Sequence, residues 1–137
     1  MVRSILAVVA GYLVMFLGVS LFFVFAMAVG FGEMPRDPAA FQPPAWLYVA
    51  EVVFGTLAAL GGGYVCVWVA RRRQQRHLLV LAAVIVVLGV VSAFAESGLK
   101  PLWSSIAVVV TGALGAVAGG WLRMRQENAL PPGVTSR

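Results

Sequence analysis

The order of polar and apolar positions divides the chain into four long apolar runs separated by polar segments. None of the runs shows the polar face that a water-exposed helix repeats every three or four residues. At about 1.5 Å per residue the runs reach roughly 27 to 40 Å, which matches a hydrocarbon core of about 30 Å. We therefore predict four transmembrane helices, over residues 5–31, 46–70, 78–95 and 102–122.

Two of the three connecting segments, 71–77 and 96–100, are short, whereas 32–45 is longer and contains four prolines. Short connections join neighbouring antiparallel helices. The pattern therefore predicts an all-α membrane protein built as two tandem helical hairpins in one domain, residues 1–125. The remainder, 126–137, is predicted to be a flexible cytoplasmic tail, because its prolines and polar residues have nothing to pack against.

The second and fourth runs resemble each other. Residues 44–64 and 101–121 align without a gap and share 10 of 21 residues. Each segment begins with Pro-x-Trp and ends in Gly-Gly followed by an aromatic residue. Internal duplication would explain the similarity, and convergence on one packing solution is the alternative. The first and third runs match poorly, so the prediction of a repeat rests on the second and fourth.

Small residues recur at helical spacing along one face of each of these two runs. Helices in lipid associate by close packing through small residues, since hydrophobic burial gives little drive there. We predict that these faces hold the bundle together, and that the second and fourth helices approach most closely near their inner ends. A glycine-lined substrate path is the alternative. The predicted packing residues are Gly55, Ala59, Gly62, Gly63, Gly112, Ala116, Gly119 and Gly120.

Composition and charge agree with a membrane location. Apolar residues make up 61% of the chain, charged residues 11%, and the mean hydropathy is +0.95. Too few polar residues remain to cover a soluble domain of this size. With the N-terminus inside, eight of the ten basic residues fall on the cytoplasmic side, so the positive-inside rule predicts that both termini are cytoplasmic. The net charge of +5 thus reflects topology, and we predict no nucleic-acid binding.

Several residues at the ends of the runs are typical of the bilayer interface. The tryptophans Trp46, Trp103 and Trp121 are predicted interface anchors. Four arginines, Arg71, Arg72, Arg73 and Arg76, follow the second run and are predicted to contact anionic headgroups or simply to stop transfer. The first run is longer than the apolar part of a usual secretory signal, so we predict that it stays as a span.

Glu51 is the one acidic residue inside a predicted span, and the aligned repeat has Val108 at that position. It lies four residues before Gly55, on the small-residue face, and roughly 7 Å below Trp46. Acidic groups inside a membrane are costly and often mark ion or proton pathways. Glu51 is therefore a candidate functional acid. The alternatives are a contact between subunits and a side chain that reaches the surface to meet Arg36, Lys100, Ser104 or Ser105.

Motifs for other chemistry are missing from the sequence. It has no Ser/His/Asp set, no cluster of metal ligands and no glycine-rich loop placed to bind phosphate. His77 stands beside arginines at the start of the third run, and Cys66 is the only cysteine. We predict no enzymatic activity, no metal and no cofactor.

The segments Ile5–Tyr12, Gly62–Tyr64, Lys100–Trp103 and Gly119–Arg123, with the arginine-rich turn before His77, resemble a group of small four-span bacterial inner-membrane proteins without an assigned activity. The resemblance covers nearly the whole chain and implies a bacterial cytoplasmic (inner) membrane. Small multidrug-resistance transporters share the size and number of spans. Their embedded glutamate lies in the first helix, however, whereas Glu51 lies in the second.

Two functions follow as predictions. The first is a structural or accessory protein that associates, through its small-residue faces, with itself or with a larger membrane protein. The alternative is a small proton-coupled carrier or channel that acts as an oligomer, with Glu51 as its coupling group. Lipid is a partner in either case.

Overall fold

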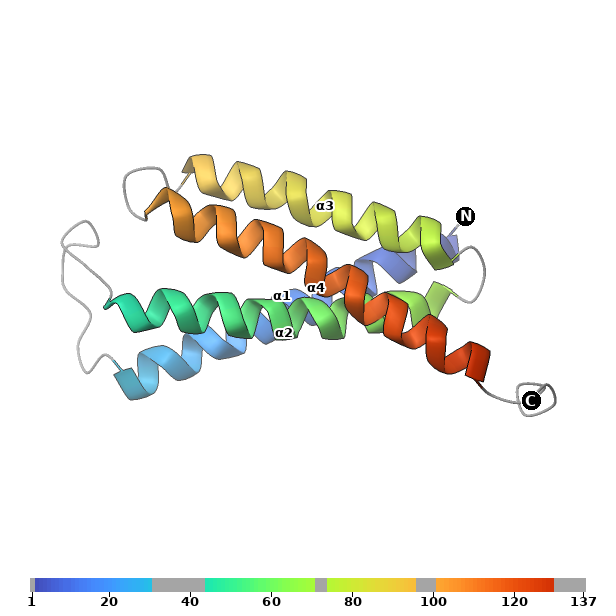
Figure 1. Ribbon diagram of the computed structural model, residues 1–137, viewed down its shortest axis with the longest axis horizontal. Helices are drawn as coiled ribbons and strands as arrows, with labels where there is room; N and C mark the ends of the chain where they lie inside the picture. The colour runs from blue at the N-terminus through green and yellow to red at the C-terminus, as the bar shows by residue number, and fades with distance from the viewer. Residues whose placement is uncertain (1, 31–43, 71–73, 96–100, 130–137) are drawn as a thin grey trace.

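The computed structural model describes residues 2–30, 44–70, 74–95 and 101–129, and these residues form four α-helices (Figure 1). Each helix is long and apolar enough to cross a membrane, which confirms the prediction of an all-α protein with four spans. Their bounds are α1 Val2–Gly30, α2 Ala45–Ala70, α3 Gln74–Ala95 and α4 Leu102–Ala129.

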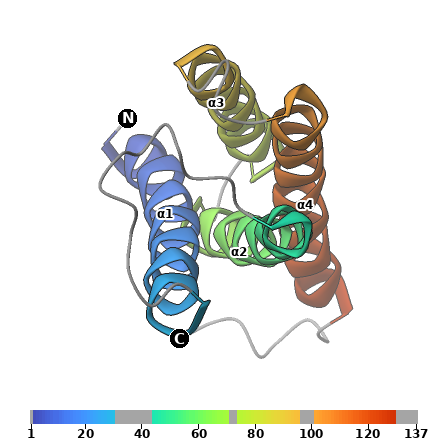
Figure 2. The ribbon, with the colours of Figure 1, turned by 90° about the vertical axis from the view of Figure 1, so that its left-hand side faces the viewer.

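Helix α2 is central to the bundle (Figure 2). It contacts each of the other three helices, and its contact with α4 is the most extensive in the described part of the chain. Helix α3 lies against α4 and also reaches α1, whereas α1 and α4 do not contact each other within the described residues. Because the main contact joins α2 to α4, across the two predicted hairpins, the grouping into hairpins stays a prediction.

The bundle has two distinct ends. We call the end where α2 and α4 begin, at Ala45 and Leu102, the entry end. We call the opposite end, where α2 finishes and α3 begins with Gln74, the basic end. Figure 1 shows α3 and α4 diverging from α1 and α2 toward the entry end and α2 crossing α4 toward the basic end.

Helices α2 and α4 start in the same way, each just after a proline. The backbone N–H of Leu47 donates to the carbonyl oxygen of Pro44 at 2.9 Å, and that of Ser104 donates to Pro101 at 3.0 Å. Proline suits such a position because its φ is already helical and it has no N–H group to satisfy. The shared Pro-x-Trp pattern therefore places Trp46 and a second tryptophan in the first turn of each helix.

Helix α4 extends further than expected. It continues to Ala129 and so takes in the first residues of the segment 126–137, which was predicted to be a flexible tail. Residues 130–137 lie outside the described part of the chain.

Polar contacts at the basic end explain this extension. The hydroxyl of Tyr64 donates to Oε1 of Gln126 at 2.9 Å. Glu127 accepts a hydrogen bond of 2.6 Å from Nε2 of Gln74 and forms an ion pair of 3.0 Å with Arg123, one turn earlier. These contacts tie the last turns of α4 to α2 and α3, and an (i, i+4) ion pair also favours the helix locally.

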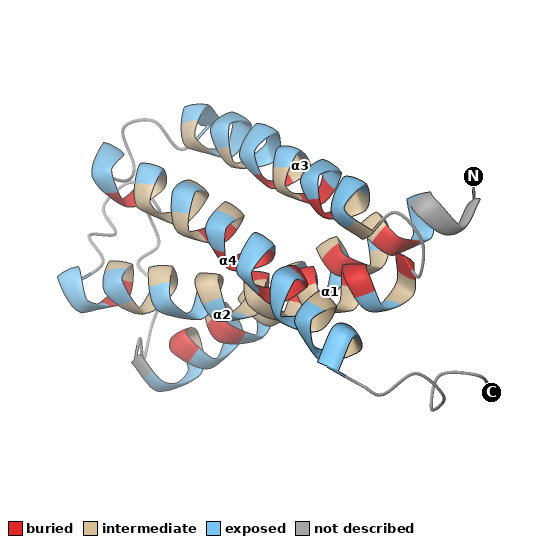
Figure 3. Cartoon of the chain, turned by 45° about the vertical axis from the view of Figure 1, so that its right-hand side comes forward, coloured by how far each residue is buried: buried red, intermediate tan, exposed pale blue. Residues whose placement is uncertain are grey.

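Much of the helical surface is apolar and exposed (Figure 3). Only 17 to 28% of the residues in the most apolar part of each span are buried. Side chains such as Leu21, Phe94 and Leu102 are at least 69% exposed. A soluble protein rarely exposes so large a continuous apolar surface, whereas hydrocarbon solvates it readily.

Candidate functional site

Glycine contacts close the bundle between α2 and α4 in its basic half. A Cβ atom added to Gly63 would overlap the backbone carbonyl of Ala116, and one added to Gly119 would overlap that of Leu60. Nearer the middle, a Cβ on Gly115 would come within 2.8 Å of the carbonyl oxygen of Thr56. Such close backbone approach requires glycine. The sequence predicted the closest approach of these two helices in this region.

The same half of α2 also packs closely against α1. A Cβ on Gly62 would lie 2.5 Å from the carbonyl oxygen of Gly11, and one on Gly11 would lie 2.7 Å from that of Gly62. Ala59, one turn earlier, and Ala116 on α4 are fully buried. Because Gly62 faces α1 while Gly63 faces α4, adjacent residues of one helix close two interfaces.

Helix α3 completes this half through Gly120, which was also predicted as a packing residue. A Cβ on Gly120 would lie 2.6 Å from methyl carbons of Leu78 on α3 and 3.0 Å from a methyl carbon of Val67 on α2, so this glycine packs against both helices. Leu78 and Leu81, both on α3, are buried in the bundle.

Two of the predicted packing glycines, Gly55 and Gly112, do not make such contacts. A Cβ on Gly55 would meet nothing within 4 Å, and one on Gly112 would lie at an ordinary distance of 3.6 Å from Ile85. Both glycines line a cavity instead. The alignment of the two repeats pairs these glycines, and it likewise pairs Glu51 with Val108, which also line the cavity.

This cavity, which we call the entry cavity, consists of two adjoining hollows in the entry half. The larger has a volume of about 300 Å³ and the smaller about 120 Å³. All four helices contribute to the larger hollow, and both hollows share the residues Glu51, Gly89, Ser92, Val108 and Val109.

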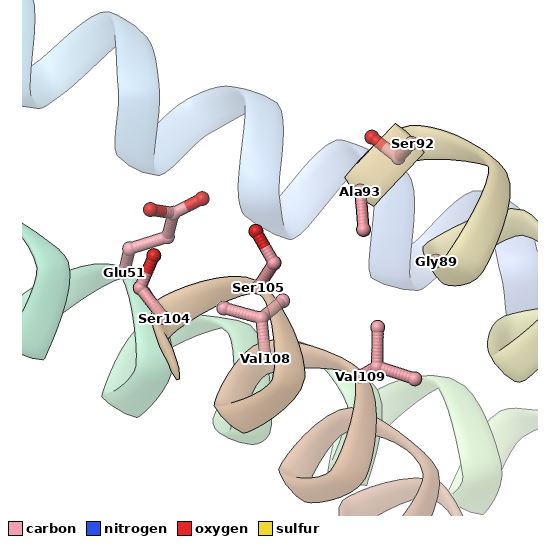
Figure 4. Close-up of a pocket in the computed structure, with 8 residues that line it drawn as sticks. All are labelled: Glu51, Gly89, Ser92, Ala93, Ser104, Ser105, Val108 and Val109. Carbon is pink, nitrogen blue, oxygen red and sulfur yellow. The ribbon is translucent and has the colours of Figure 1, made fainter. Parts of the chain in front are cut away.

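The polar part of the entry cavity lies around Glu51. Figure 4 shows its carboxylate and the hydroxyl of Ser105 directed to the same side of α2 and α4, toward α1. Ser92, near the end of α3, and Ser104 line the smaller hollow as well. The hydroxyl of Ser104 donates to the carbonyl oxygen of Pro101 at 3.0 Å, so its proton is engaged by the residue just before α4. The cavity thus combines one carboxylate with several hydroxyl groups.

The rest of the larger hollow is mostly apolar and aromatic. Helix α1 contributes Tyr12, Phe16 and Phe23, and α3 contributes Ile85 and Leu88. Toward the basic end, the helices that line the hollow come together at the glycine contacts of α2. The hollow therefore ends inside the bundle, at about its middle.

The other predicted site residues lie apart from the cavity. Trp46, Trp103 and Trp121 are each more than half exposed, as side chains that face lipid or its interface would be. The guanidinium carbon of Arg125 lies 4.6 Å from the ring centre of Trp121, at the basic end. Arg76 is exposed near the start of α3, and Arg71, Arg72 and Arg73 lie outside the described residues.

Of the four partners predicted for Glu51, two lie beside it and two are not among the described residues. Ser104 and Ser105 line the smaller hollow beside it, whereas Arg36 and Lys100 lie outside the described residues. Cys66 is fully buried in the basic half, away from the cavity. Among the described residues no three His, Cys, Asp or Glu side chains come together as metal ligands.

Two features of the site were not predicted from the sequence. Val108 entered only as the residue aligned with Glu51, and its place on the wall of the same cavity follows from how α2 and α4 pack. Ser92 could have been noticed, because it is the only polar side chain in the run 78–95. A single hydroxyl in an otherwise apolar span is a weak signal, since a helix can satisfy it internally.

Comparisons with protein-family models, with curated proteins and with solved structures found no match to this chain.

Proposed function

We propose that the protein is a small carrier of the cytoplasmic membrane, in which Glu51 binds a proton or another cation inside the entry cavity. The observation that carries this proposal is the position of Glu51. It is the one acidic side chain among the described residues that line the cavity, and all four helices form the walls around it. An acid held in a shaped, mostly apolar cavity is the usual arrangement for binding and releasing a cation within a membrane.

The two halves of the bundle favour a carrier over an open channel. The cavity ends at about the middle of the bundle, where glycines bring α2 against α1 and α4. A channel needs a continuous path, whereas a carrier alternates between arrangements that open to one side at a time. We place the basic end in the cytoplasm on the positive-inside rule, so that the cavity lies in the half of the membrane away from the cytoplasm.

The same glycine contacts count against association through the small-residue faces. In the basic half these faces are already occupied within one chain: Gly62 by α1, and Gly63 and Gly119 by the contact between α2 and α4. A structural or accessory subunit, the first prediction from the sequence, would have to bind its partner through other surfaces. The lipid-facing side of α3, with Leu79, Val87 and Val91 exposed, is one such surface.

The proposal is tested by proton flux into liposomes that contain only the purified protein and a pH-sensitive dye. A membrane potential, negative inside, should acidify the lumen faster than in protein-free liposomes, and Glu51→Gln should remove the increase. The matched control is Glu127→Gln, which neutralises a carboxylate at the basic end, outside the cavity. Equal rates for the unmodified protein and Glu51→Gln, or no flux above protein-free liposomes, would contradict the proposal.

A further inference from the structure

We propose that the entry cavity binds a small amphipathic organic cation, with its nitrogen cation at Glu51 and its apolar body against the aromatic side chains of α1. This inference rests on the proposed function, because it names the ligand class of the same cavity.

The charged residues that line the cavity indicate the sign of the ligand's charge. Glu51 is the only acidic side chain among the described residues that line the two hollows, and no Lys or Arg is among them. An ionised carboxylate can only accept hydrogen bonds, and its attraction for a cation increases in surroundings of low dielectric constant. The hydroxyl of Ser105, directed to the same side, supplies a further oxygen (Figure 4). The cavity therefore favours a single positive charge at this point.

The walls select the rest of the ligand. Tyr12, Phe16 and Phe23 of α1 line the larger hollow, together with the aliphatic residues Leu88 of α3 and Val109 of α4. Aromatic rings attract cations at their faces as well as packing against apolar groups, and they are the usual wall of sites for substituted ammonium ions. A ligand with one cationic nitrogen and an apolar body matches both parts of this surface.

A bare metal ion matches the cavity less well. Hard cations such as Ca²⁺ take six to eight oxygen ligands, usually from several carboxylates and carbonyls. Here a single carboxylate is accompanied only by serine hydroxyls among the described residues that line the smaller hollow, which is fewer charged oxygen ligands than such an ion usually takes. An organic ammonium ion spreads its charge over a larger surface and needs fewer such contacts, so it loses less on leaving water.

The volume sets the size of the ligand. At about 300 Å³, the larger hollow is at the lower end of the range of roughly 300 to 1,000 Å³ for pockets that bind drug-sized molecules. We therefore expect a body of one ring or a short alkyl chain. Benzyltrimethylammonium, with one ring and a permanent charge, is a suitable probe.

The experiment is calorimetric titration of benzyltrimethylammonium into the purified full-length protein in dodecyl maltoside, a detergent without charge. We expect saturable binding of one ligand per cavity, and Glu51→Gln should weaken it roughly 10- to 100-fold, the range for loss of a charge-assisted contact. Neopentylbenzene, which has carbon in place of the nitrogen, should not displace the probe. Glu127→Gln is the control and should bind as the unmodified protein does.

Two further variants keep the test valid if Glu51→Gln is poorly folded. Gly55→Leu leaves the carboxylate in place but fills the cavity, so it should abolish binding. The double substitution Glu51→Val with Val108→Glu moves the carboxylate across the cavity and should retain binding within about tenfold. Unchanged affinity in Gly55→Leu, or displacement of the probe by sodium but not by other ammonium ions, would overturn the proposal.

The ammonium group could belong to a lipid or to a soluble amine. Added phosphatidylethanolamine should compete with the probe if the natural ligand is a lipid headgroup, whereas phosphatidylglycerol, which has no nitrogen, should not. Lack of competition by phosphatidylethanolamine assigns the site to a soluble cation. Both results agree with the proposed chemistry, and competition by phosphatidylglycerol alone would contradict it.

The binding experiment and the flux assay can fail independently of each other. Binding at Glu51 without Glu51-dependent proton flux would sink the carrier proposal and leave a cation-binding protein. Glu51-dependent flux without binding of the probe would leave the carrier in place and show that the ligand class is wrong.

Discussion

The two halves of α2 place the same residue type in opposite surroundings. Gly63, in the basic half, lies so close to Ala116 that no side chain fits between the helices, whereas Gly55, two turns earlier on the same helix, faces open space within 4 Å. The corresponding residues of α4 differ in the same way: Gly119 meets the backbone of Leu60, and Gly112 lines the entry cavity. A small-residue face can therefore close an interface at one level of the membrane and leave room for a ligand at another.

The difference comes from what lies opposite each glycine. In the basic half, the side chains across the interface are themselves small, as at Gly11 and Ala116, so backbones can meet. In the entry half the neighbouring helices carry larger groups. Phe22 of α1 stacks on Phe54 of α2, with ring centres 4.6 Å apart, and Leu47 packs in the same cluster. Bulky side chains thus lie between α1 and α2 in the entry half, where the basic half has glycine and alanine.

The largest expected effect comes from Gly63→Leu. Because its side chain would overlap the backbone carbonyl of Ala116, α2 and α4 must separate. Overpacking a core costs typically about 1 to 3 kcal/mol, and we expect the upper end of that range or more, since the backbone itself has to move. The measurement is loss of helical structure during titration with denaturing detergent.

Gly55→Leu is the matched control in the same helix. The open space beside Gly55 should keep its stability within about 1 kcal/mol of the unmodified protein. Equal losses for the two variants would show that the halves are not different.

Filling the cavity should separate stability from function. In Gly55→Leu we expect a folded bundle in which proton flux and binding of the cation probe are both lost, because the new side chain occupies the larger hollow. The comparison is with Gly55→Ala, which adds one methyl group and should retain most of both activities. A Gly55→Leu variant with normal flux would show that the hollow is not the path of the ion.

Moving the carboxylate sharpens the comparison within the entry half. Val108 occupies the repeat position of Glu51 and lines the same two hollows. The double substitution Glu51→Val with Val108→Glu should therefore restore at least about a tenth of the flux that Glu51→Val alone abolishes. Complete loss in the double variant would show that the position of the acid matters and not only its presence in the cavity.

The smallest expected effect concerns the basic end. Tyr64→Phe removes the hydrogen bond to Gln126 but keeps the ring, so stability should fall by about 1 kcal/mol or less. Amide hydrogen exchange should become faster in the last turn of α4, whereas flux through the entry cavity should not change. Altered flux would mean that the two ends are coupled more directly than their separate contacts indicate.

The sequence predicted the four helices well, because an apolar run must be long enough to cross the hydrocarbon core and is therefore easy to recognise. It also identified the glycines of the basic half and singled out Glu51 as the unusual acid. It did not predict the cavity, since a glycine indicates that close approach is possible and says nothing about what lies across the interface. Gly55 and Gly63 look alike in the sequence. The extension of α4 was missed because it depends on Gln74 and Tyr64, which are distant in the chain.

Thiol labelling tests the contrast between the two halves most directly. In the variant Gly55→Cys the new thiol lies in the entry cavity, while the native Cys66, fully buried in the basic half, serves as an internal reference on the same helix. Membrane vesicles are treated with a small, cationic, water-soluble thiol reagent, and the modified cysteine is identified by peptide mass. We predict that residue 55 reacts at least about ten times faster than Cys66. Equal rates at the two positions, or faster reaction at Cys66, would contradict an open entry half and a closed basic half.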